Sequence, residues 1–225
     1  MNRSQIEEKA RLLQFEIYWA RDLLFPYGVP PMHLMFEPTV AARVLHLEYE
    51  QRERIGSAQS GYEAAGMLDR DRGIISVSCR FPYAVQRFTG AHEIGHFMLH
   101  PHLGTGGTVH RDRPIHEMRA TGRPRSEQDA DYFGACFLAP RKLVREEFKK
   151  RFGNQPLRLD ENLAWHLCGD SYTDLYSEPR ELKFAAALAS ARKLDGRHFP
   201  SLSDYFAISP SAMAIRLHEL ELVID

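Results

Sequence analysis

The chain has 225 residues, 44% hydrophobic and 26% charged, a composition that can bury a sizeable core and excludes disordered, collagenous and disulfide-scaffold proteins. Its 29 basic and 30 acidic residues nearly cancel, so no global charge attracts it to nucleic acid or anionic lipid. No apolar run approaches the roughly 20 residues of a membrane helix, and acidic residues interrupt the N-terminus where a secretory signal would be apolar. We therefore expect a cytoplasmic protein without a membrane segment.

The first half of the chain is predicted to be mixed helix and strand. Apolar residues at helical spacing predict helices over 4–25, with Ser4 as a candidate N-cap, and over 39–47. Short segments rich in β-branched and aromatic residues predict strands over 47–51, 62–68 and 74–79. A turn sequence separates the last two strands, so they should form a hairpin within a small sheet.

The second half is predicted to be helical. A helix over 85–100 should end at Pro101 because the residue before proline disfavours helical geometry, and a long loop over 103–126 follows. Further helices are predicted over 127–139, 140–152, 157–167 and 180–194. The segment 202–222 is predicted to form two helices joined by a turn at 208–210. We expect Trp19 and Trp165 to pack in the core.

Histidine is the compositional anomaly, with 11 residues, and two of them form an HExxH pattern, His92-Glu93-Ile94-Gly95-His96. Residues four apart on a helix lie one above the other, so both imidazoles can reach one ion. Glu93 lies between them, offset around the helix, where it can meet a water molecule without being a ligand. This arrangement is typical of catalytic zinc, which takes neutral nitrogen ligands and keeps one position open.

The third ligand is expected from the next helix, where Glu127 and Asp131 lie four residues apart on one face. Glu127 is the predicted metal ligand. Asp131 is predicted to hydrogen-bond the other ring nitrogen of a ligating histidine and so to fix its orientation.

Alternative ligands stay open at this point. Asp129 lies on a different face of the same predicted helix, and His100 and His102 follow the motif closely. His102 has the spacing of the metzincin pattern, but Leu99 occupies the position where that pattern has glycine. Two further histidines in the loop, His110 and His116, are either solvated or could donate to a developing oxyanion.

Two segments of the sequence resemble signatures of the ImmA/IrrE metallopeptidase family. The segment 87–100, RFTGAHEIGHFMLH, is similar to RFTxAHExGHxxLH, and the segment 127–140, EQDADYFGACFLAP, is similar to ExEAnxFAxxLLMP. Gly134 occupies a position of the second signature where alanine is common. The tail over 202–223 also resembles the segment with which many members end.

The resemblance implies an α+β fold: a zincin-like metallopeptidase domain, mostly helical with a small sheet of about three strands, followed by a C-terminal helical region. We assign residues 1–153 to the metallopeptidase domain and 154–225 to the helical region, which is helix-turn-helix-like and packs on the first. In such a fold His92, His96 and Glu127 hold the metal, and Glu93 is the catalytic base. The expected cofactor is Zn²⁺, with Mn²⁺ or another divalent ion as an alternative.

The resemblance also implies a regulatory endopeptidase that cuts a protein such as a helix-turn-helix repressor, as in the control of stress responses. Two alternatives belong to other classes. One is a catalytically silent, antitoxin-like metal-binding partner, although such a protein would not need Glu93. The other is a DNA-binding regulator using the C-terminal helices, but residues 201–225 carry one arginine and four acids, which disfavours direct contact with phosphates.

Overall fold

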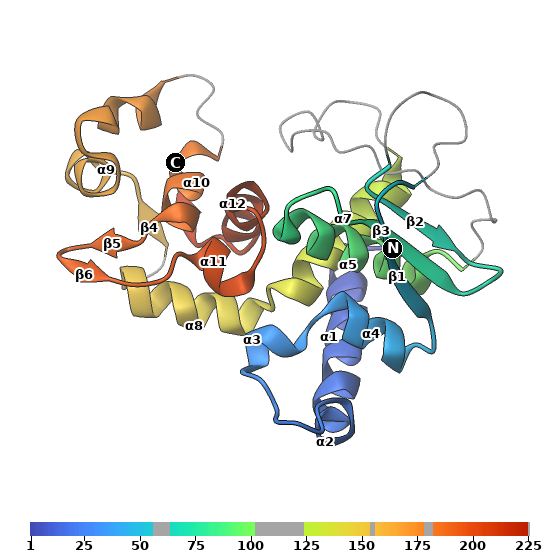
Figure 1. Cartoon of the computed structure of the whole chain (residues 1–225). Coiled ribbons are helices and arrows are strands. Elements are labelled where there is room, and N and C mark those ends of the chain that lie inside the picture. The colour runs from blue at the N-terminus through green and yellow to red at the C-terminus, as the bar shows by residue number, and fades with distance from the viewer. Residues whose placement is uncertain (56–63, 102–123, 154–155, 178–181, 225) are drawn as a thin grey trace. The chain divides into compact units, whose positions relative to one another are not determined.

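The computed structural model describes residues 1–55, 64–101, 124–153, 156–177 and 182–224 (Figure 1). The contacts divide the chain into two compact units, Met1–Leu138 and Ala139–Asp225. These units are defined by contacts alone, and the domain boundary that the sequence suggests at residue 153 stays a prediction. The architecture is α+β and mostly helical, with small sheets of two or three strands, as predicted.

The N-terminal helix of the first unit is α1 (Arg3–Trp19), and the short α2 (Arg21–Leu24) follows it. The predicted N-cap, Ser4, was wrong. The cap is Asn2, whose side chain accepts from the backbone N–H of Gln5 at 2.9 Å, while the Gln5 side chain accepts from the N–H of Asn2 at 3.0 Å. This reciprocal pair satisfies two N–H groups that the first helical turn leaves open. After α2 come α3 (Met32–Met35) and α4 (Pro38–Val44), which begins at a proline, as its missing N–H permits.

The sheet of the first unit has three strands in the order β1-β3-β2. The strands are β1 (Glu48–Arg52), β2 (Gly66–Asp69) and β3 (Ile74–Ser78). The predicted hairpin is confirmed, since β2 is antiparallel to β3. On the other side of β3, β1 runs parallel to it, a pairing that the sequence does not indicate, and this places the fully buried β3 in the centre.

Two long helices, α5 (Tyr83–Leu99) and α7 (Arg125–Leu138), make the most extensive helix pair of this unit. α5 also packs against β2 and β3, and α1 packs against α7. The Gln14 side chain of α1 donates to the carbonyl oxygens of Cys136 and Phe137 at the end of α7, both at 2.9 Å. The C-terminal end of α7 is thus tied to a helix far away in the sequence.

A glycine allows α5 and α7 to approach closely. A Cβ atom at Gly95 would lie 3.1 Å from both the Cα and the carbonyl oxygen of Ala130, and 3.2 Å from the Cβ of Phe133. Contacts this short are tighter than the great majority of real Cβ contacts, so a side chain here would require the facing helix to shift by a few tenths of an ångström. On the opposite helix, a Cβ at Gly134 would meet α5 at 3.5 Å or more, which is ordinary van der Waals contact.

The second unit consists of helices and two very small sheets. Its elements are α8 (Arg141–Phe152), β4 (Leu157–Arg158), α9 (Glu161–Cys168), η1 (Gly169–Tyr176), α10 (Lys183–Ser190), β5 (Lys193–Leu194), β6 (Arg197–His198), α11 (Leu202–Phe206), α12 (Pro210–Glu219) and β7 (Val223–Ile224). β4 pairs in parallel with β7, and β5 forms an antiparallel pair with β6.

Several predicted elements of the second unit were wrong in extent. The helix predicted over 157–167 begins only at Glu161, because residues 157–158 join β7 as a strand. The helix predicted over 180–194 ends at Ser190, and Lys193–Leu194 enters a hairpin. The prediction for 202–222 is confirmed in its order of helix, turn and helix: α11 ends where Ala207 adopts a left-handed conformation, and α12 begins at Pro210.

The prediction that both tryptophans lie in the core was also wrong. Trp19 is 67% exposed and Trp165 is 50% exposed. Each rests its ring edge against one neighbouring aromatic side chain, Phe15 and Tyr172 respectively. Within the described residues, no helix combines the length and the apolar character that crossing a membrane requires.

Candidate metal centre

α5 places both histidines of the HExxH pattern on its buried face. The Nε2 atoms of His92 and His96 lie 2.8 Å apart, and both side chains are buried. They are four residues apart on a continuous helix, so the 3.6-residue repeat brings the rings together without help from a loop.

Glu127, in the first turn of α7, completes a cluster of three candidate ligands. Its Oε1 lies 3.3 Å from Nε2 of His96, and its Oε2 lies 3.6 Å from Nε2 of His92. One ligand atom from each residue lies within 4.8 Å of the others, which makes this a group that could hold a metal ion. α5 and α7 therefore bring together the three side chains that were predicted as ligands, and their role as ligands stays a prediction.

The dimensions of the cluster fit a zinc ion. Ligand atoms about 2.0–2.2 Å from a tetrahedral ion are about 3.3–3.6 Å apart, since the ligand–metal–ligand angle is near 109°. The carboxylate of Glu127 meets this spacing to both imidazoles, at 3.3 and 3.6 Å, and the two imidazoles are slightly closer, at 2.8 Å. The two Nε2 atoms would have to separate from 2.8 Å to about 3.3 Å for all three pairs to match this spacing.

Asp131 orients one of the imidazoles. Its Oδ1 lies 2.7 Å from Nδ1 of His92, so Nδ1 carries the proton and Nε2 faces the cluster. Burial acts to lower the pKa of His92, but the hydrogen bond and charge of Asp131, with Glu127 and Glu93, raise that pKa to about 9. Binding of a metal at Nε2 must therefore displace a proton.

His96 differs electrostatically from its partner. Burial lowers the pKa of His96, and the charge of His92 acts in the same direction, whereas Glu127 opposes the shift. A lowered pKa keeps this imidazole neutral at pH 7, which is the form that donates a lone pair to a metal.

Glu93 is completely buried beside the cluster. Burial raises its pKa to about 8, since a charged carboxylate loses its hydration there; Glu127 adds to the rise and His92 opposes it. A carboxyl group with a pKa near neutrality can both accept and return a proton at pH 7.

The start of β2 lies over this carboxyl group. A Cβ at Gly66 would collide with Cγ2 of Thr89 and would lie 3.1 Å from Oε1 of Glu93. Sequence reasoning missed the roles of Gly66 and Thr89. A glycine at a strand end is a signal of close backbone approach, but it does not say what approaches.

The comparison with protein families gives an independent result. A family model described as Peptidase_M78, IrrE N-terminal-like domain, matches residues 31–167, which is more than half of the chain. The chain belongs to this family. The comparison with curated proteins found no match. The resemblance inferred from the two signatures is thereby confirmed, and all three candidate ligands of this Peptidase_M78 member lie within the matched residues.

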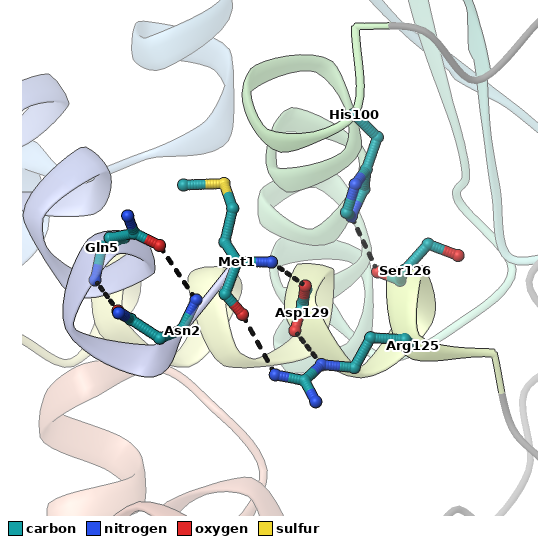
Figure 2. A network of polar contacts seen from close by, with 7 residues as sticks. All are labelled: Met1, Asn2, Gln5, His100, Arg125, Ser126 and Asp129. Atoms are coloured by element: carbon teal, nitrogen blue, oxygen red, sulfur yellow. Dashed lines mark hydrogen bonds and ion pairs between the residues drawn. The ribbon is translucent and has the colours of Figure 1, made fainter.

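Asp129, the alternative carboxylate, lies outside the cluster. It accepts a hydrogen bond from Nε of Arg125 at 3.0 Å and lies 3.4 Å from the amino group of Met1 (Figure 2). Arg125 also donates to the carbonyl oxygen of Met1 at 3.0 Å. Asp129 follows Glu127 by two positions on the helix, so its carboxylate points to a different side, where Arg125 and the amino group of Met1 engage it.

Of the alternative histidines, only His100 lies within the described residues, and its ring contacts the backbone of α7. Nε2 of His100 lies 3.1 Å from the carbonyl oxygen of Ser126, so this ring bridges the end of α5 and the first turn of α7 (Figure 2). The other three, His102, His110 and His116, lie outside the described residues.

Proposed function

We propose that this member of the Peptidase_M78 family is a zinc-dependent endopeptidase that cuts a protein substrate, such as a helix-turn-helix repressor. The observation that carries the proposal is the convergence of His92, His96 and Glu127 around one point, with the buried acid Glu93 beside them. A structural zinc site usually has four protein ligands, whereas a catalytic site has three and keeps one position open. Three candidate ligands beside a buried carboxyl group of raised pKa therefore favour a catalytic site.

Zinc suits the donor set better than the other divalent ions. Two imidazoles and one carboxylate are typical catalytic zinc ligands, whereas manganese and magnesium prefer sites made of oxygen. Bound zinc supplies a Lewis acid that polarises a carbonyl group and makes water a better nucleophile at neutral pH.

Glu93 is proposed to be the catalytic base. In its ionised form Glu93 can take a proton from the attacking water and deliver that proton to the leaving amine, and the raised pKa makes this carboxylate a stronger base. Asp131 holds His92 in the tautomer that keeps Nε2 available throughout.

The substrate is proposed to bind in extended form along β2. In the described part of the sheet β2 is an edge strand that pairs only with β3, and it begins next to Glu93. An added strand would obtain main-chain hydrogen bonds there. Of the strand predicted over 62–68, residues 62 and 63 lie outside the described residues, and β2 itself begins at Gly66.

A protein is favoured over DNA as the partner. Arg216 is the one lysine or arginine between residues 201 and 225, and its side chain is fully buried, donating to the carbonyl oxygen of Ala139 at 3.1 Å. A buried guanidinium cannot neutralise phosphates, which supply most of the affinity for nucleic acid. We propose this protein as a cytoplasmic one that acts without direct contact to nucleic acid.

The test combines metal analysis with cleavage. The zinc-loaded protein is incubated with helix-turn-helix repressors from the same organism, and the products are identified by mass spectrometry. Glu93→Gln should keep its zinc and lose cleavage by a factor of at least about 10², because a positioned base contributes typically that much. Asp129→Asn serves as the control, since it changes a buried acid of the same region outside the cluster.

Two results would count against the proposal. Cleavage by Glu93→Gln at the wild-type rate would remove Glu93 from the reaction. Tight binding of a repressor without any cleavage by the zinc-loaded wild type would support the silent, antitoxin-like alternative instead.

A further inference from the structure

The last turn of α5 carries the second histidine of the cluster and is held from outside the helix. A helix leaves its last four carbonyl groups without helical N–H donors. The carbonyl of Phe97 would take its donor from residue 101, but that residue is Pro101, which has no N–H. The end of α5 therefore needs a donor from another element.

Arg70 supplies this donor. Its guanidinium donates from Nη1 to the carbonyl oxygen of Phe97 at 3.2 Å and from Nη2 to that of His96 at 2.8 Å. The guanidinium carbon also lies 5.4 Å from the centre of the Phe97 ring. One planar side chain thus holds the carbonyl groups of two consecutive residues, and one of these residues, His96, is a candidate metal ligand.

The turn that presents Arg70 is itself well fixed. Arg70 directly follows β2, and Oδ1 of Asp69 accepts from the backbone N–H of Arg72 at 3.1 Å. Gly73 closes the turn with a φ of 67°, and its carbonyl accepts from the N–H of Glu48 at 2.9 Å. The guanidinium therefore extends from a rigid hairpin rather than from a loose loop.

We propose that Arg70 is a positioning residue for the metal centre: by holding the carbonyls of His96 and Phe97 it fixes the backbone from which the His96 imidazole projects. The inference rests on the proposed metal site and extends it to a residue of the sheet. The same hairpin contains β2, which begins next to Glu93. One hairpin therefore contacts both the catalytic base proposed above and, through Arg70, the backbone of His96. Bidentate geometry matters here, because lysine would replace the rigid planar fork of the guanidinium with a single ammonium group on a flexible stem, whose donors are not held in a fixed direction.

A neighbouring contact provides a matched control. Nζ of Lys9, from α1, donates to the carbonyl oxygen of Met98 at 3.0 Å. Lys9 is thus a second cation at the end of α5, but the carbonyl that it holds belongs to Met98, which lies two residues after His96. Loss of either cation should lower the melting temperature, but only loss of Arg70 should loosen the backbone of His96.

The experiment measures zinc affinity by competition with a chelating indicator, alongside the melting temperature and the visible spectrum of the Co²⁺-loaded protein. Arg70→Met should weaken zinc binding at least tenfold, in line with residues that orient metal ligands, and should change the Co²⁺ spectrum. Arg70→Lys should fall between Arg70→Met and the wild type. Lys9→Met should bind zinc within twofold of the wild type.

The outcomes separate this inference from the proposed function. Equal zinc affinity in Arg70→Met and the wild type would overturn it, and so would an equal loss in Lys9→Met, which would indicate only a general weakening of the helix end. If the wild type itself binds no zinc, the metal site fails and the inference fails with it. If the wild type binds zinc but cuts no substrate, the endopeptidase proposal fails, and the comparison of affinities still decides the role of Arg70.

Discussion

Alanine at Gly95 tests whether the approach of α5 and α7 sets the metal centre. Alanine is favoured over glycine in a helix by about 1 kcal/mol. At Gly95, however, the new Cβ would lie 3.1 Å from two backbone atoms of Ala130, which cannot turn away as a side chain can. Overpacking of this kind costs about 1–3 kcal/mol, so Gly95→Ala should leave the free energy of unfolding unchanged or lower by up to about 2 kcal/mol.

Gly134 provides the matched comparison on the facing helix. Its new Cβ would have neighbours at 3.5–3.6 Å, so Gly134→Ala should raise the free energy of unfolding by about 0.5–1 kcal/mol. The two variants should therefore differ by about 1–3 kcal/mol in urea unfolding followed by circular dichroism. The measurement is made on metal-free protein, because a bound metal adds its own stabilisation. Separation of the helices in Gly95→Ala should also weaken zinc binding. Equal stabilisation by both alanines would refute the reasoning.

Three further predictions concern acidic residues. Glu127→Ala should lose its zinc on dialysis, as measured by elemental analysis, whereas Asp129→Asn should keep it. Asp131→Asn should weaken zinc binding about 10- to 100-fold in a competition titration, because the amide no longer fixes the tautomer of the ring it contacts. In the second unit, burial opposes ionisation of Glu147, but hydrogen bonds from Lys150 and Arg151 prevail and lower its pKa. Its stabilising effect should be present above the unfolded-state pKa of about 4.3 and be lost as the pH falls through the lower folded-state pKa. Glu147→Gln should thus be less stable than the wild type in urea at pH 7 and differ less at pH 3.5.

The sequence predicted the centre of the site because its geometry is local. The spacing of His92 and His96 along one helix decides that their rings meet, and Pro101 decides where that helix ends. Glu127 could be ranked above Asp129 only by its helical phase with Asp131. The structure adds a reason to prefer Glu127 over Asp129 as the ligand, since Arg125 and the amino group of Met1 already contact Asp129.

Other features depend on partners that are distant in the sequence. Nothing in Glu48–Arg52 indicates that this strand lies parallel to β3, and residues 157–158 form a strand only because Val223–Ile224 pairs with them. Trp19 has the chemistry of a core residue, yet it lies two positions after Ile17, off the buried face of α1, and is exposed. Periodicity predicts which residues share a face of a helix, but not whether another element covers that face.

The contact between Gln14 and the end of α7 bears on which fragment of the chain can be expressed on its own. α1 precedes the residues that the family model matches, 31–167, although it packs along the helix that carries Glu127. A recombinant fragment trimmed to the matched residues would keep every candidate ligand and still expose the apolar side of α7, inviting aggregation. The matched residues 31–167 are therefore too short a fragment for expression, and the fragment must also include α1.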